Sequence, residues 1–578
     1  MQYHYTNEKN VLFCISLLKA YGIKKIVVSP GATNVTFVAS VQRDSYFELY
    51  SSVDERSAAY IACGLAAESG EPVALSCTGA TASRNYYPGI TEAYYRKLPV
   101  LAITSTRDVS KIGHLHDQQM DRSVQPKDTV KCSVQIQTIK DATDEWDVMI
   151  KLNKAMQALT RNGGGPAHIN LTTTYSRDYS VLELPKVRKI GHFTIFDELP
   201  PIEQQKKIAI YVGTHTKWTK RLTDAVDKFC QSHNAVVFSE PCSGYKGKYR
   251  VFYFMAGNQP VPDDNKCPDL LIHIGEVSAF PDTFSGCKEV WRVNEDGEIR
   301  DKLKKLTNVF EMPEYAFFEH YCIDTVGDDS YLTACKKRNE ELQKMIPELP
   351  FSNVWIAQQM HDRFPSGAVL HLGILSSLRA WTLMGTPANI DINCNEGGFG
   401  IDGNMSSLLG ASLVHPDKLY FGIVGDLSFF YDMNVVGNRH LRSNVRIMII
   451  NNGRGNEFRL YTNPARMFGA ETDEYISAAR HFGNKSPLVI KHYAEDLGFE
   501  YFSAVNKEEF HRHCQRFLTS EMTGKPMIFE VFTDTEDENT ALYTVNNLDQ
   551  SSKDKLKDKI KGIVGEDTIK SLKAFIKK

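Results

Sequence analysis

Two apolar runs, each followed by a polar residue suited to a metal ion, most constrain how this chain can fold. Residues 419–424 and 445–450 have the length and apolar content of buried parallel strands. Asp426 follows the first run and Asn452 follows the second. Because open α/β sheets bind ligands at the carboxyl ends of their strands, we expect these two side chains to lie together. A carboxylate, an amide oxygen and a nearby carbonyl suit Mg²⁺, so the pattern predicts a diphosphate held through a metal.

Short apolar runs alternate with helix-length stretches along most of the chain, which predicts an α/β protein with three doubly wound parallel sheets. The expected strands of the first sheet are residues 25–30, 73–77, 100–104 and 167–171. Those of the second are residues 208–212, 235–238, 270–274 and 289–293, and those of the third are residues 369–372, 419–424, 445–450 and 527–531.

We expect four parts in the 578-residue chain: domains at 1–185, 200–335 and 350–545, and a tail at 551–578. A proline-bearing passage at 198–202 separates the first two, and a charged, helical stretch at 301–350 is interpreted as a connector. The first strand of the central domain is not followed by a GxGxxG turn, so we expect no nucleotide cofactor there.

The tail contains nine lysines and four acidic residues, and its apolar residues recur at helical spacing. This pattern predicts a basic amphipathic helix that contacts an acidic membrane surface or a partner. A helix packed on the body of the protein, or frayed in solution, is an equally compatible interpretation.

Bulk composition excludes several classes of protein. The net charge of −3 argues against a general nucleic-acid binder. The twelve scattered cysteines include no CxxC pair, which favours reduced thiols in a cytoplasmic protein. The polar N-terminus does not resemble a signal peptide, and no apolar run reaches the roughly 18 residues of a transmembrane helix.

The segment Gly425-Asp426-Leu427-Ser428, with Asn452 downstream, resembles the metal-binding signature of thiamine diphosphate (ThDP) enzymes of the acetolactate synthase and pyruvate decarboxylase superfamily. The form GDLS is similar to that of the menaquinone-pathway SEPHCHC synthases, as are residues 398–403 and 54–59. The resemblance implies pyrimidine-binding, central and diphosphate-binding domains, with ThDP and Mg²⁺ as cofactors.

The resemblance also implies roles for individual residues. Glu55 is the expected catalytic carboxyl group, which hydrogen-bonds the pyrimidine ring of ThDP, and we expect it to be buried. Its other interpretation is that Asp54 and Glu55 merely favour a helix N-terminus. Asp426, Asn452 and the carbonyl of Arg454 would bind Mg²⁺. The remaining cofactor residues implied are Gly400, Ile401, Gly425, Leu427 and Ser428. Ile401 would hold ThDP in a bent shape, although an ordinary core isoleucine is the alternative.

In this family the site lies between subunits, with the glutamate from one chain and the diphosphate domain from another. Both parts are present here, so the resemblance implies a homodimer or homotetramer with paired sites.

Substrate residues match the SEPHCHC synthases only in part. Arg107, Gln118 (also implied as catalytic) and Arg379 match. Thr33 and Glu396 stand where the synthases carry arginines, and residues 279–282 replace a Lys-Arg pair. Fewer cations would disfavour a multiply anionic acceptor. His114 and His116 would serve either proton transfer, as in related decarboxylases, or simply lie solvated in a loop.

The sequence therefore predicts a ThDP- and Mg²⁺-dependent enzyme that decarboxylates a 2-oxo acid donor and transfers the acyl anion to a small-molecule acceptor, a carbonyl or alkene. Surface-polysaccharide or sugar biosynthesis is one possible setting. The alternatives are SEPHCHC synthase, which uses 2-oxoglutarate and isochorismate, a simple decarboxylase or acetolactate synthase-like enzyme, and an inactive binding or regulatory member.

Overall fold

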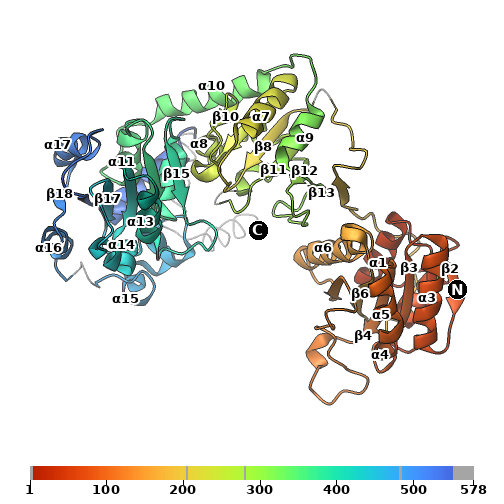
Figure 1. The fold of residues 1–578 in the computed structure, drawn as a ribbon. Helices are drawn as coiled ribbons and strands as arrows, with labels where there is room; N and C mark the ends of the chain where they lie inside the picture. The colour runs from red at the N-terminus through yellow and green to blue at the C-terminus, as the bar shows by residue number, and fades with distance from the viewer. Residues whose placement is uncertain (1–3, 204–205, 279–280, 481–484, 551–578) are drawn as a thin grey trace, which may run out of the picture. The chain divides into compact units, whose positions relative to one another are not determined.

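The computed structural model describes residues 4–203, 206–278, 281–480 and 485–550 (Figure 1). The predicted amphipathic tail at 551–578 lies outside the described residues. The chain divides into two compact units. Unit 1 comprises residues 1–197 and 296–311, and unit 2 comprises residues 198–295 and 312–578. None of the helices in the described ranges is both long and apolar enough to cross a membrane.

Unit 1 contains a six-stranded parallel sheet of order β2-β1-β3-β4-β6-β5. Its strands are β1 (Lys25–Val28), β2 (Glu48–Ser51), β3 (Val73–Thr78), β4 (Val100–Thr106), β5 (Cys132–Ile136) and β6 (Ala167–Thr172). Its helices are α1 (Lys9–Ala20), α2 (Val35–Val41), α3 (Glu55–Ser69), α4 (Ala82–Asn85), α5 (Tyr87–Arg96) and α6 (Ala142–Ala158).

Helices cover both faces of this sheet because successive strand residues point to opposite sides. Ile26 packs in one core with apolar residues of α1, α2 and α6. Its neighbour Val27 packs in the other core, with α3, α4 and α5. The doubly wound arrangement predicted from the alternation of apolar runs is confirmed.

Unit 2 begins with the central parallel strands, in the order β10-β9-β8-β11-β12. These are β8 (Ile208–Val212), β9 (Ala235–Ser239), β10 (Arg250–Val251), β11 (Leu270–Ile274) and β12 (Glu289–Val293). The accompanying helices are α7 (Lys220–Ser232), α8 (Phe254–Gly257), α9 (Glu314–Tyr321) and α10 (Ser330–Met345).

The stretch at 301–350 was predicted to be only a helical connector, and this is wrong in part. It contains β13 (Leu306–Glu311), which pairs in parallel with β7 (Gly191–Thr194) in unit 1. Lysines at positions 302, 304 and 305 dominate the composition just before this short strand and obscure it in the sequence.

The second sheet of unit 2 is also six-stranded and parallel, with the order β15-β14-β16-β17-β19-β18. Its strands are β14 (Val369–Leu372), β15 (Asp391–Cys394), β16 (Tyr420–Gly425), β17 (Val445–Asn451), β18 (Glu500–Ala504) and β19 (Met527–Phe532). Its helices are α11 (Asn353–Met360), α12 (Ser376–Met384), α13 (Asn404–Val414), α14 (Asp426–Asp432), α15 (Thr472–Tyr475), α16 (Val489–Asp496), α17 (Lys507–Phe517) and α18 (Thr535–Asn546).

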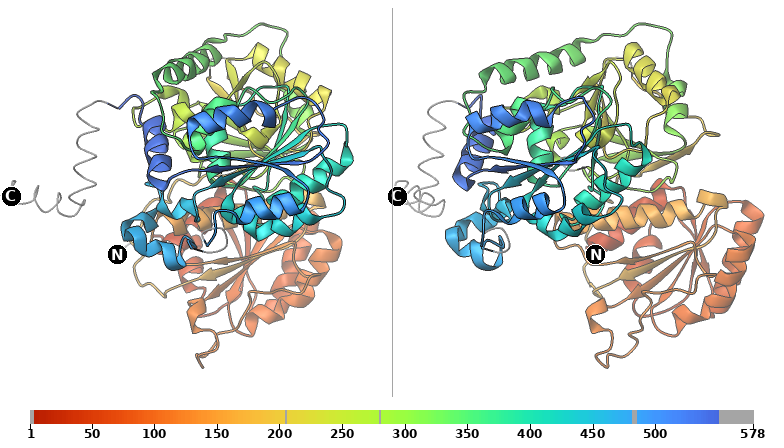
Figure 2. Two further views of the ribbon diagram at one scale, coloured as in Figure 1. Left: turned by 90° about the vertical axis from the view of Figure 1, so that its left-hand side faces the viewer. Right: turned by 60° about the vertical axis from the view of Figure 1, so that its left-hand side comes forward.

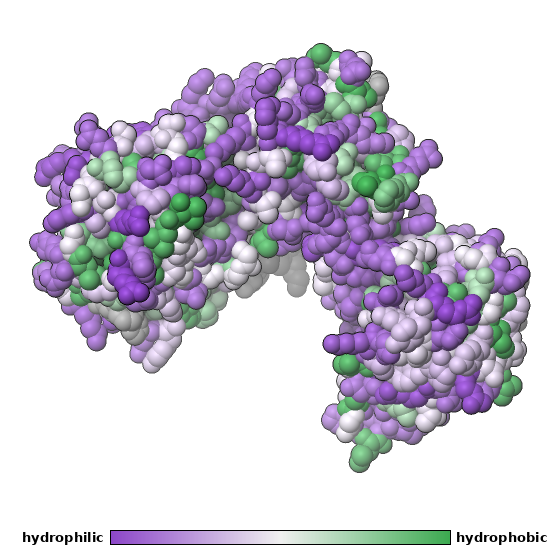
Figure 3. Space-filling model, viewed as in Figure 1, coloured by the Kyte–Doolittle hydropathy of each residue, from purple (hydrophilic) through white to green (hydrophobic). Residues whose placement is uncertain are grey.

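This sheet also has helices on both faces (Figure 2). Its core on one face joins α13, α14 and α16 to strand residues such as Val424 and Ile449. On the other face, Phe517 of α17 packs edge-on against Phe421 and at a tilt against Phe529. The outer surface in view is mostly hydrophilic, with scattered apolar patches (Figure 3).

Candidate cofactor half-sites

Asp426 and Asn452 lie at the carboxyl ends of two neighbouring strands, as predicted. β16 and β17 pair directly, with Gly425 opposite Ile450. Asp426 opens α14 immediately after β16, and Asn452 follows the last residue of β17. The backbone N–H of Asn452 lowers the pKa of the Asp426 carboxyl group, so the two residues lie close together.

The oxygen atoms of this pair fit a magnesium ion. Burial raises the pKa of Asp426 to about 7, against the opposing effect of backbone hydrogen bonds, and the nearby Glu530 carboxylate raises it further. Asn452 Oδ1 is buried and has no hydrogen-bond partner among the described residues. A buried carboxylate without a cation and an orphaned amide oxygen are both costly unless a hard cation binds them. In the described part of the chain, no three His, Cys, Asp or Glu side chains gather in a way that could hold a metal.

Arg454 could contribute to such a site only through its backbone. Its guanidinium Nη1 lies 2.9 Å from both carboxylate oxygens of Asp473, which also accepts from Arg459 at 2.7 Å. The Arg454 guanidinium is therefore engaged in an ion pair with Asp473. The backbone carbonyl of Arg454 remains available as the metal ligand that the family resemblance implies.

Ile401 is held in place by the two helices that follow it in the fold. The Ser428 hydroxyl of α14 donates to the Ile401 carbonyl at 2.5 Å, and Asn404 Nδ2 of α13 donates to the same carbonyl at 2.9 Å. Asn404 also donates to Ser428 Oγ at 2.9 Å. Ser428 was predicted to meet the diphosphate, but its hydroxyl hydrogen is used within the protein, so a backbone contact is the remaining possibility.

The two candidate glycines of this half-site, Gly400 and Gly425, differ in how much free space surrounds them. A Cβ atom at Gly400 would come within 2.5 Å of Oδ1 of the exposed Asp402 side chain, which can move aside. A Cβ at Gly425 would meet no atom within 4 Å. The space at Gly425 is open, as a site for a ligand requires. The backbone N–H of Leu427 lowers the pKa of the Asp426 carboxyl group and so lies close to it.

Unit 1 carries the second half-site at the start of α3. Asp54 caps this helix by accepting from the backbone N–H groups of Arg56 (2.8 Å) and Ser57 (3.2 Å). Glu55 is the first residue of the helix, and its Oε2 accepts from Asn85 Nδ2 at 3.2 Å. The expected burial of Glu55 is incomplete: the residue is half-buried, because its own unit covers only one side of it. Tyr60, one turn further along α3, is 49% exposed.

Arg107 and the loop that contains Gln118 lie in the same unit. Arg107 follows β4 and donates to Asp117 Oδ1 at 2.9 Å and to the Tyr175 hydroxyl at 3.2 Å. His114, His116 and Gln118 are all exposed. Three loop residues adopt left-handed backbone angles: Gly113 (φ 82°), Leu115 (φ 58°) and Gln118 (φ 55°). In this structure the two histidines are solvated loop residues.

Thr33, predicted at the substrate site, is instead a buried structural residue. Its hydroxyl donates to the Ser105 carbonyl at 2.7 Å and accepts from the Gly79 N–H at 3.1 Å. It also contacts the hydroxyl of Thr78. Thr33 therefore joins the loops that follow β1, β3 and β4, and its hydroxyl is not free to bind a substrate.

Arg379 and Glu396, the two residues of unit 2 that were predicted to contact the substrate, also bind other residues of the protein. Arg379 of α12 makes a two-pronged ion pair with Glu457, at 2.9 and 3.0 Å. Glu396 is 1% exposed and accepts a hydrogen bond from Thr214. Burial, and secondly the Glu240 carboxylate, raises the pKa of Glu396 to about 7. Glu396 is thus buried and hydrogen-bonded within unit 2 in this structure. Of residues 279–282, positions 279 and 280 lie outside the described residues.

Sequence reasoning missed Arg122, a buried cation in unit 1. Its guanidinium donates to Asn170 Oδ1 at 3.0 and 2.8 Å and to the Gly79 carbonyl. Burial lowers its pKa to about 10. Arg122 thus anchors the loop that bears Gln118 to the ends of β3 and β6. No motif marks it, because its partners are distant in sequence.

Comparison with known proteins identifies the class. Residues 13–125 match the family described as thiamine pyrophosphate enzyme, N-terminal TPP binding domain. This segment contains α3 and Glu55. The chain is thus a ThDP-dependent enzyme that acts on a 2-oxo acid.

Several curated relatives cover nearly the whole chain. Proteins named 2-succinyl-5-enolpyruvyl-6-hydroxy-3-cyclohexene-1-carboxylate synthase from Phocaeicola vulgatus and Bacteroides thetaiotaomicron are 30% and 31% identical to it. The first alignment covers 93% of this chain and 98% of the relative, and the second covers 92% and 96%. A protein of the same name from Flavobacterium johnsoniae is 28% identical over 90% of this chain and 95% of its own length. The chain belongs to this synthase family.

Proposed function

We propose that this protein is a ThDP- and Mg²⁺-dependent synthase that decarboxylates a 2-oxo acid and joins the remaining acyl group to a second substrate. The observation that carries the proposal is the neighbouring position of the buried Asp426 carboxylate and Asn452, whose Oδ1 has no hydrogen-bond partner among the described residues. Asp426, Asn452 and the Arg454 carbonyl would bind the metal and, through it, the cofactor's diphosphate.

The remaining residues would orient the cofactor. When bound, ThDP supplies a carbanion that attacks the 2-oxo acid and absorbs the electrons released with CO₂. Glu55 would hold a proton against the pyrimidine ring, and the Asn85 amide fixes its carboxyl group. Ile401 would support the bent cofactor, since Ser428 and Asn404 fix its carbonyl. Gly400, Gly425 and Leu427 would line the diphosphate side.

The relatives support a specific reaction. Their shared name describes the synthesis of 2-succinyl-5-enolpyruvyl-6-hydroxy-3-cyclohexene-1-carboxylate. We propose the same reaction for this chain, with 2-oxoglutarate as the donor of the succinyl unit and isochorismate as the acceptor. Arg107 would meet an anionic substrate by exchanging Asp117 for a substrate carboxylate, and Gln118 lies three residues beyond Leu115 on the same exposed loop.

A second candidate keeps the same chemistry but uses a less anionic acceptor, such as a ketosugar of surface-polysaccharide biosynthesis. It is favoured by the ion pairs of Arg107 with Asp117 and of Arg379 with Glu457. A substrate carboxylate would have to displace an acid at each arginine. Thr33 is uncharged and stands where the resembled synthases carry an arginine, so one positive charge is missing.

A product assay distinguishes the two candidates. Purified protein with ThDP and Mg²⁺ is incubated with 2-oxoglutarate or pyruvate, each with isochorismate, with a nucleotide-linked ketosugar, or alone. Mass spectrometry of an adduct between 2-oxoglutarate and isochorismate would support the first candidate, and a sugar adduct the second. Free aldehyde as the sole product under every condition would reject both.

Variants of α3 show whether the expected catalytic residue is responsible. Glu55→Gln should abolish turnover, while Glu68→Gln, on the exposed side of the same helix, should leave it unchanged. Undiminished turnover by Glu55→Gln would contradict the proposed role of this residue. Both proteins should bind ThDP with Mg²⁺, because the diphosphate residues are intact.

The expected quaternary structure is a homodimer or homotetramer with each site built from two chains. Incomplete burial of Glu55 and the exposed Tyr60 and Ile61 on α3 support a surface that another subunit covers.

A further inference from the structure

A cavity of about 590 Å³ lies within unit 2, away from the cofactor half-site. Its walls come from the loops that follow β8 and β9 and from the edge strand β15. It also reaches Val369 and Tyr420, which begin β14 and β16. Asp426 follows the opposite end of β16, and six strand residues span roughly 17 Å. The cavity and the half-site are therefore separate.

Positive charge without acidic partners faces this cavity. Lys217, Arg250 and Lys418 all line it, and none of them forms an ion pair with any residue in the described ranges. Among the described residues, the Arg250 guanidinium donates only to the Thr386 carbonyl, at 3.0 Å, and burial lowers its pKa. A partly buried guanidinium without a carboxylate is unfavourable unless an anion binds it.

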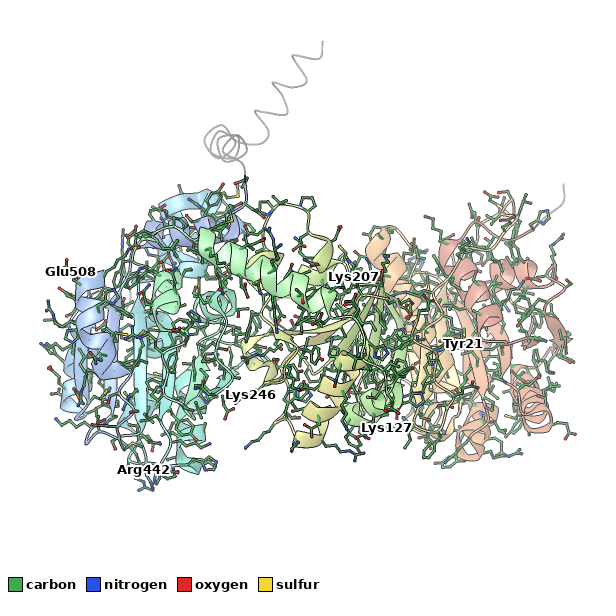
Figure 4. All side chains as sticks on the ribbon, turned by 90° about the horizontal axis from the view of Figure 1, so that it is seen from above. Tyr21, Lys127, Lys207, Lys246, Arg442 and Glu508 are labelled. Atoms are coloured by element: carbon green, nitrogen blue, oxygen red, sulfur yellow. The ribbon has the colours of Figure 1, made fainter. Side chains whose placement is uncertain are left out.

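The acids on the cavity wall do not neutralise these three cations. Asp391 of β15 is paired with Lys246, at 2.5 Å. Lys246 lies where the yellow elements of unit 2 meet the cyan ones (Figure 4). Glu240 is 1% exposed, and its carboxylate accepts from the Tyr211 hydroxyl at 2.5 Å. The excess charge of the wall is therefore positive.

Aromatic rings form another part of the wall. Trp218 lies 5.0 Å from Tyr245, measured between ring centroids, and its indole N–H donates to the Ser243 carbonyl at 2.7 Å. The Arg250 guanidinium lies 4.9 Å from the centre of the Phe252 ring. These contacts hold the rings in fixed positions, and a cavity of this volume is in the range of small-molecule sites.

We propose that this cavity binds a small organic dianion whose flat, apolar body packs on the aromatic wall while Lys217, Arg250 and Lys418 bind its charges. The shared chemistry is that of a phosphate monoester or a dicarboxylate on a ring. The two negative charges would offset two of the three unpaired positive charges, and each charge-assisted hydrogen bond strengthens binding beyond that of a neutral contact. The proposal does not depend on which acceptor the enzyme uses.

Calorimetry with chemically simple probes tests the proposal. The protein is first saturated with ThDP and Mg²⁺, so that its diphosphate site is filled. Phenyl phosphate and phthalate are the two ring-bearing dianions, while inorganic phosphate lacks the ring and phenol lacks the charge. We expect one molecule of phenyl phosphate or phthalate to bind per chain, at least about fivefold tighter than phosphate or phenol. Tighter binding of phenyl phosphate would identify a phosphate monoester as the ligand class, and tighter binding of phthalate would identify a dicarboxylate. Failure of both to bind would overturn the proposal.

Variants assign the binding to this cavity. Replacing both lysines, Lys217→Gln with Lys418→Gln, should weaken binding of the ring-bearing dianion by roughly tenfold or more. Lys228→Gln is the matched control, since Lys228 is exposed on α7 but does not line the cavity. Equal binding by the double variant and the control would place the ligand elsewhere and reject the cavity.

Tryptophan fluorescence gives an independent readout of the same site. A ring-bearing dianion in the cavity should change the emission of Trp218, and Trp218→Phe should abolish that change. Product formation should persist in the double lysine variant, because neither lysine belongs to a cofactor half-site. A dianion that alters emission equally in Trp218→Phe would contradict the proposed position.

Discussion

At the scale of single residues, unit 2 buries several carboxyl groups without a cation. Burial raises the pKa values of Asp426, Glu396 and Glu538 to about 7 each. Glu538 accepts from the Asn353 N–H and Glu396 from Thr214, so both have structural partners. Asp426 lies instead beside Asn452, whose buried Oδ1 has no hydrogen-bond partner among the described residues, and this difference marks Asp426 as the ligand-binding acid.

The Asp426→Asn variant tests this interpretation through stability. In metal-free protein the folded-state pKa of Asp426 is about 7, above its ordinary value of 3.8. The folded state therefore favours the protonated form, so stability falls as pH rises from about 4 to 7 and stays low above 7. Asparagine cannot ionise, so Asp426→Asn should be more stable than wild type at pH 8, by up to about 4 kcal/mol.

Urea unfolding with a chelator present, at pH 8 and near pH 4.5, measures this effect. The advantage of the variant should shrink toward zero at the lower pH, where the wild-type carboxyl is protonated. Adding ThDP with Mg²⁺ should stabilise the wild type and not the variant. Parallel pH profiles for the two proteins would show that Asp426 is not the strained acid that the structure indicates.

At the scale of elements, the start of α3 decides where Glu55 lies. The Asp54 cap fixes the first turn of the helix, and Glu55 is the next residue. The same cap occurs on α6, where Asp141 accepts from the N–H groups of Thr143 (2.8 Å) and Asp144 (3.0 Å). The two caps are alike in geometry, but no candidate site residue lies on α6.

This pair of caps gives a matched comparison. Asp54→Ala and Asp141→Ala should each lower the free energy of unfolding of unit 1 by about 1 kcal/mol, through loss of the cap. Only Asp54→Ala should reduce turnover, by roughly tenfold or more, because it loosens the position of Glu55. Denaturant unfolding and steady-state rates measure the two effects. Equal losses of activity in the two variants would mean that reduced stability, and not a displaced Glu55, lowers turnover.

At the scale of the whole molecule, the two sheets that carry the half-sites share one topology. Their orders, β2-β1-β3-β4-β6-β5 and β15-β14-β16-β17-β19-β18, are the same when each set of strands is counted from its own first strand. Glu55 belongs to unit 1, and Asp426 belongs to unit 2. A complete site needs both, and the proposed oligomer would supply them from different chains.

Subunit complementation tests whether they come from different chains. Glu55→Gln and Asp426→Asn should each be inactive alone. In a mixed dimer, one site would combine both substitutions and the other would be intact. Random reassembly should therefore recover about a quarter of wild-type activity. No recovery after verified subunit exchange would place both residues of a site in one chain.

Much of the fold followed from local sequence. Central strands such as β16 and β17 are continuous apolar runs, because helices cover both of their faces. The edge strands β15 and β18 were missed. β15 reads Asp-Ile-Asn-Cys and is partly exposed, since an edge strand has a neighbour on one side only and does not need such a run.

The sequence by itself determined the α/β class, the neighbouring positions of Asp426 and Asn452 and the cofactor family, because periodicity and short motifs are local properties of the chain. Tertiary structure alone decided which candidates are free to bind a ligand. Thr33 and Glu396 are used internally by Ser105 and Thr214, which are distant in sequence. The cationic cavity likewise brings Lys217 and Lys418 together across about two hundred residues, and only the folded chain creates that proximity.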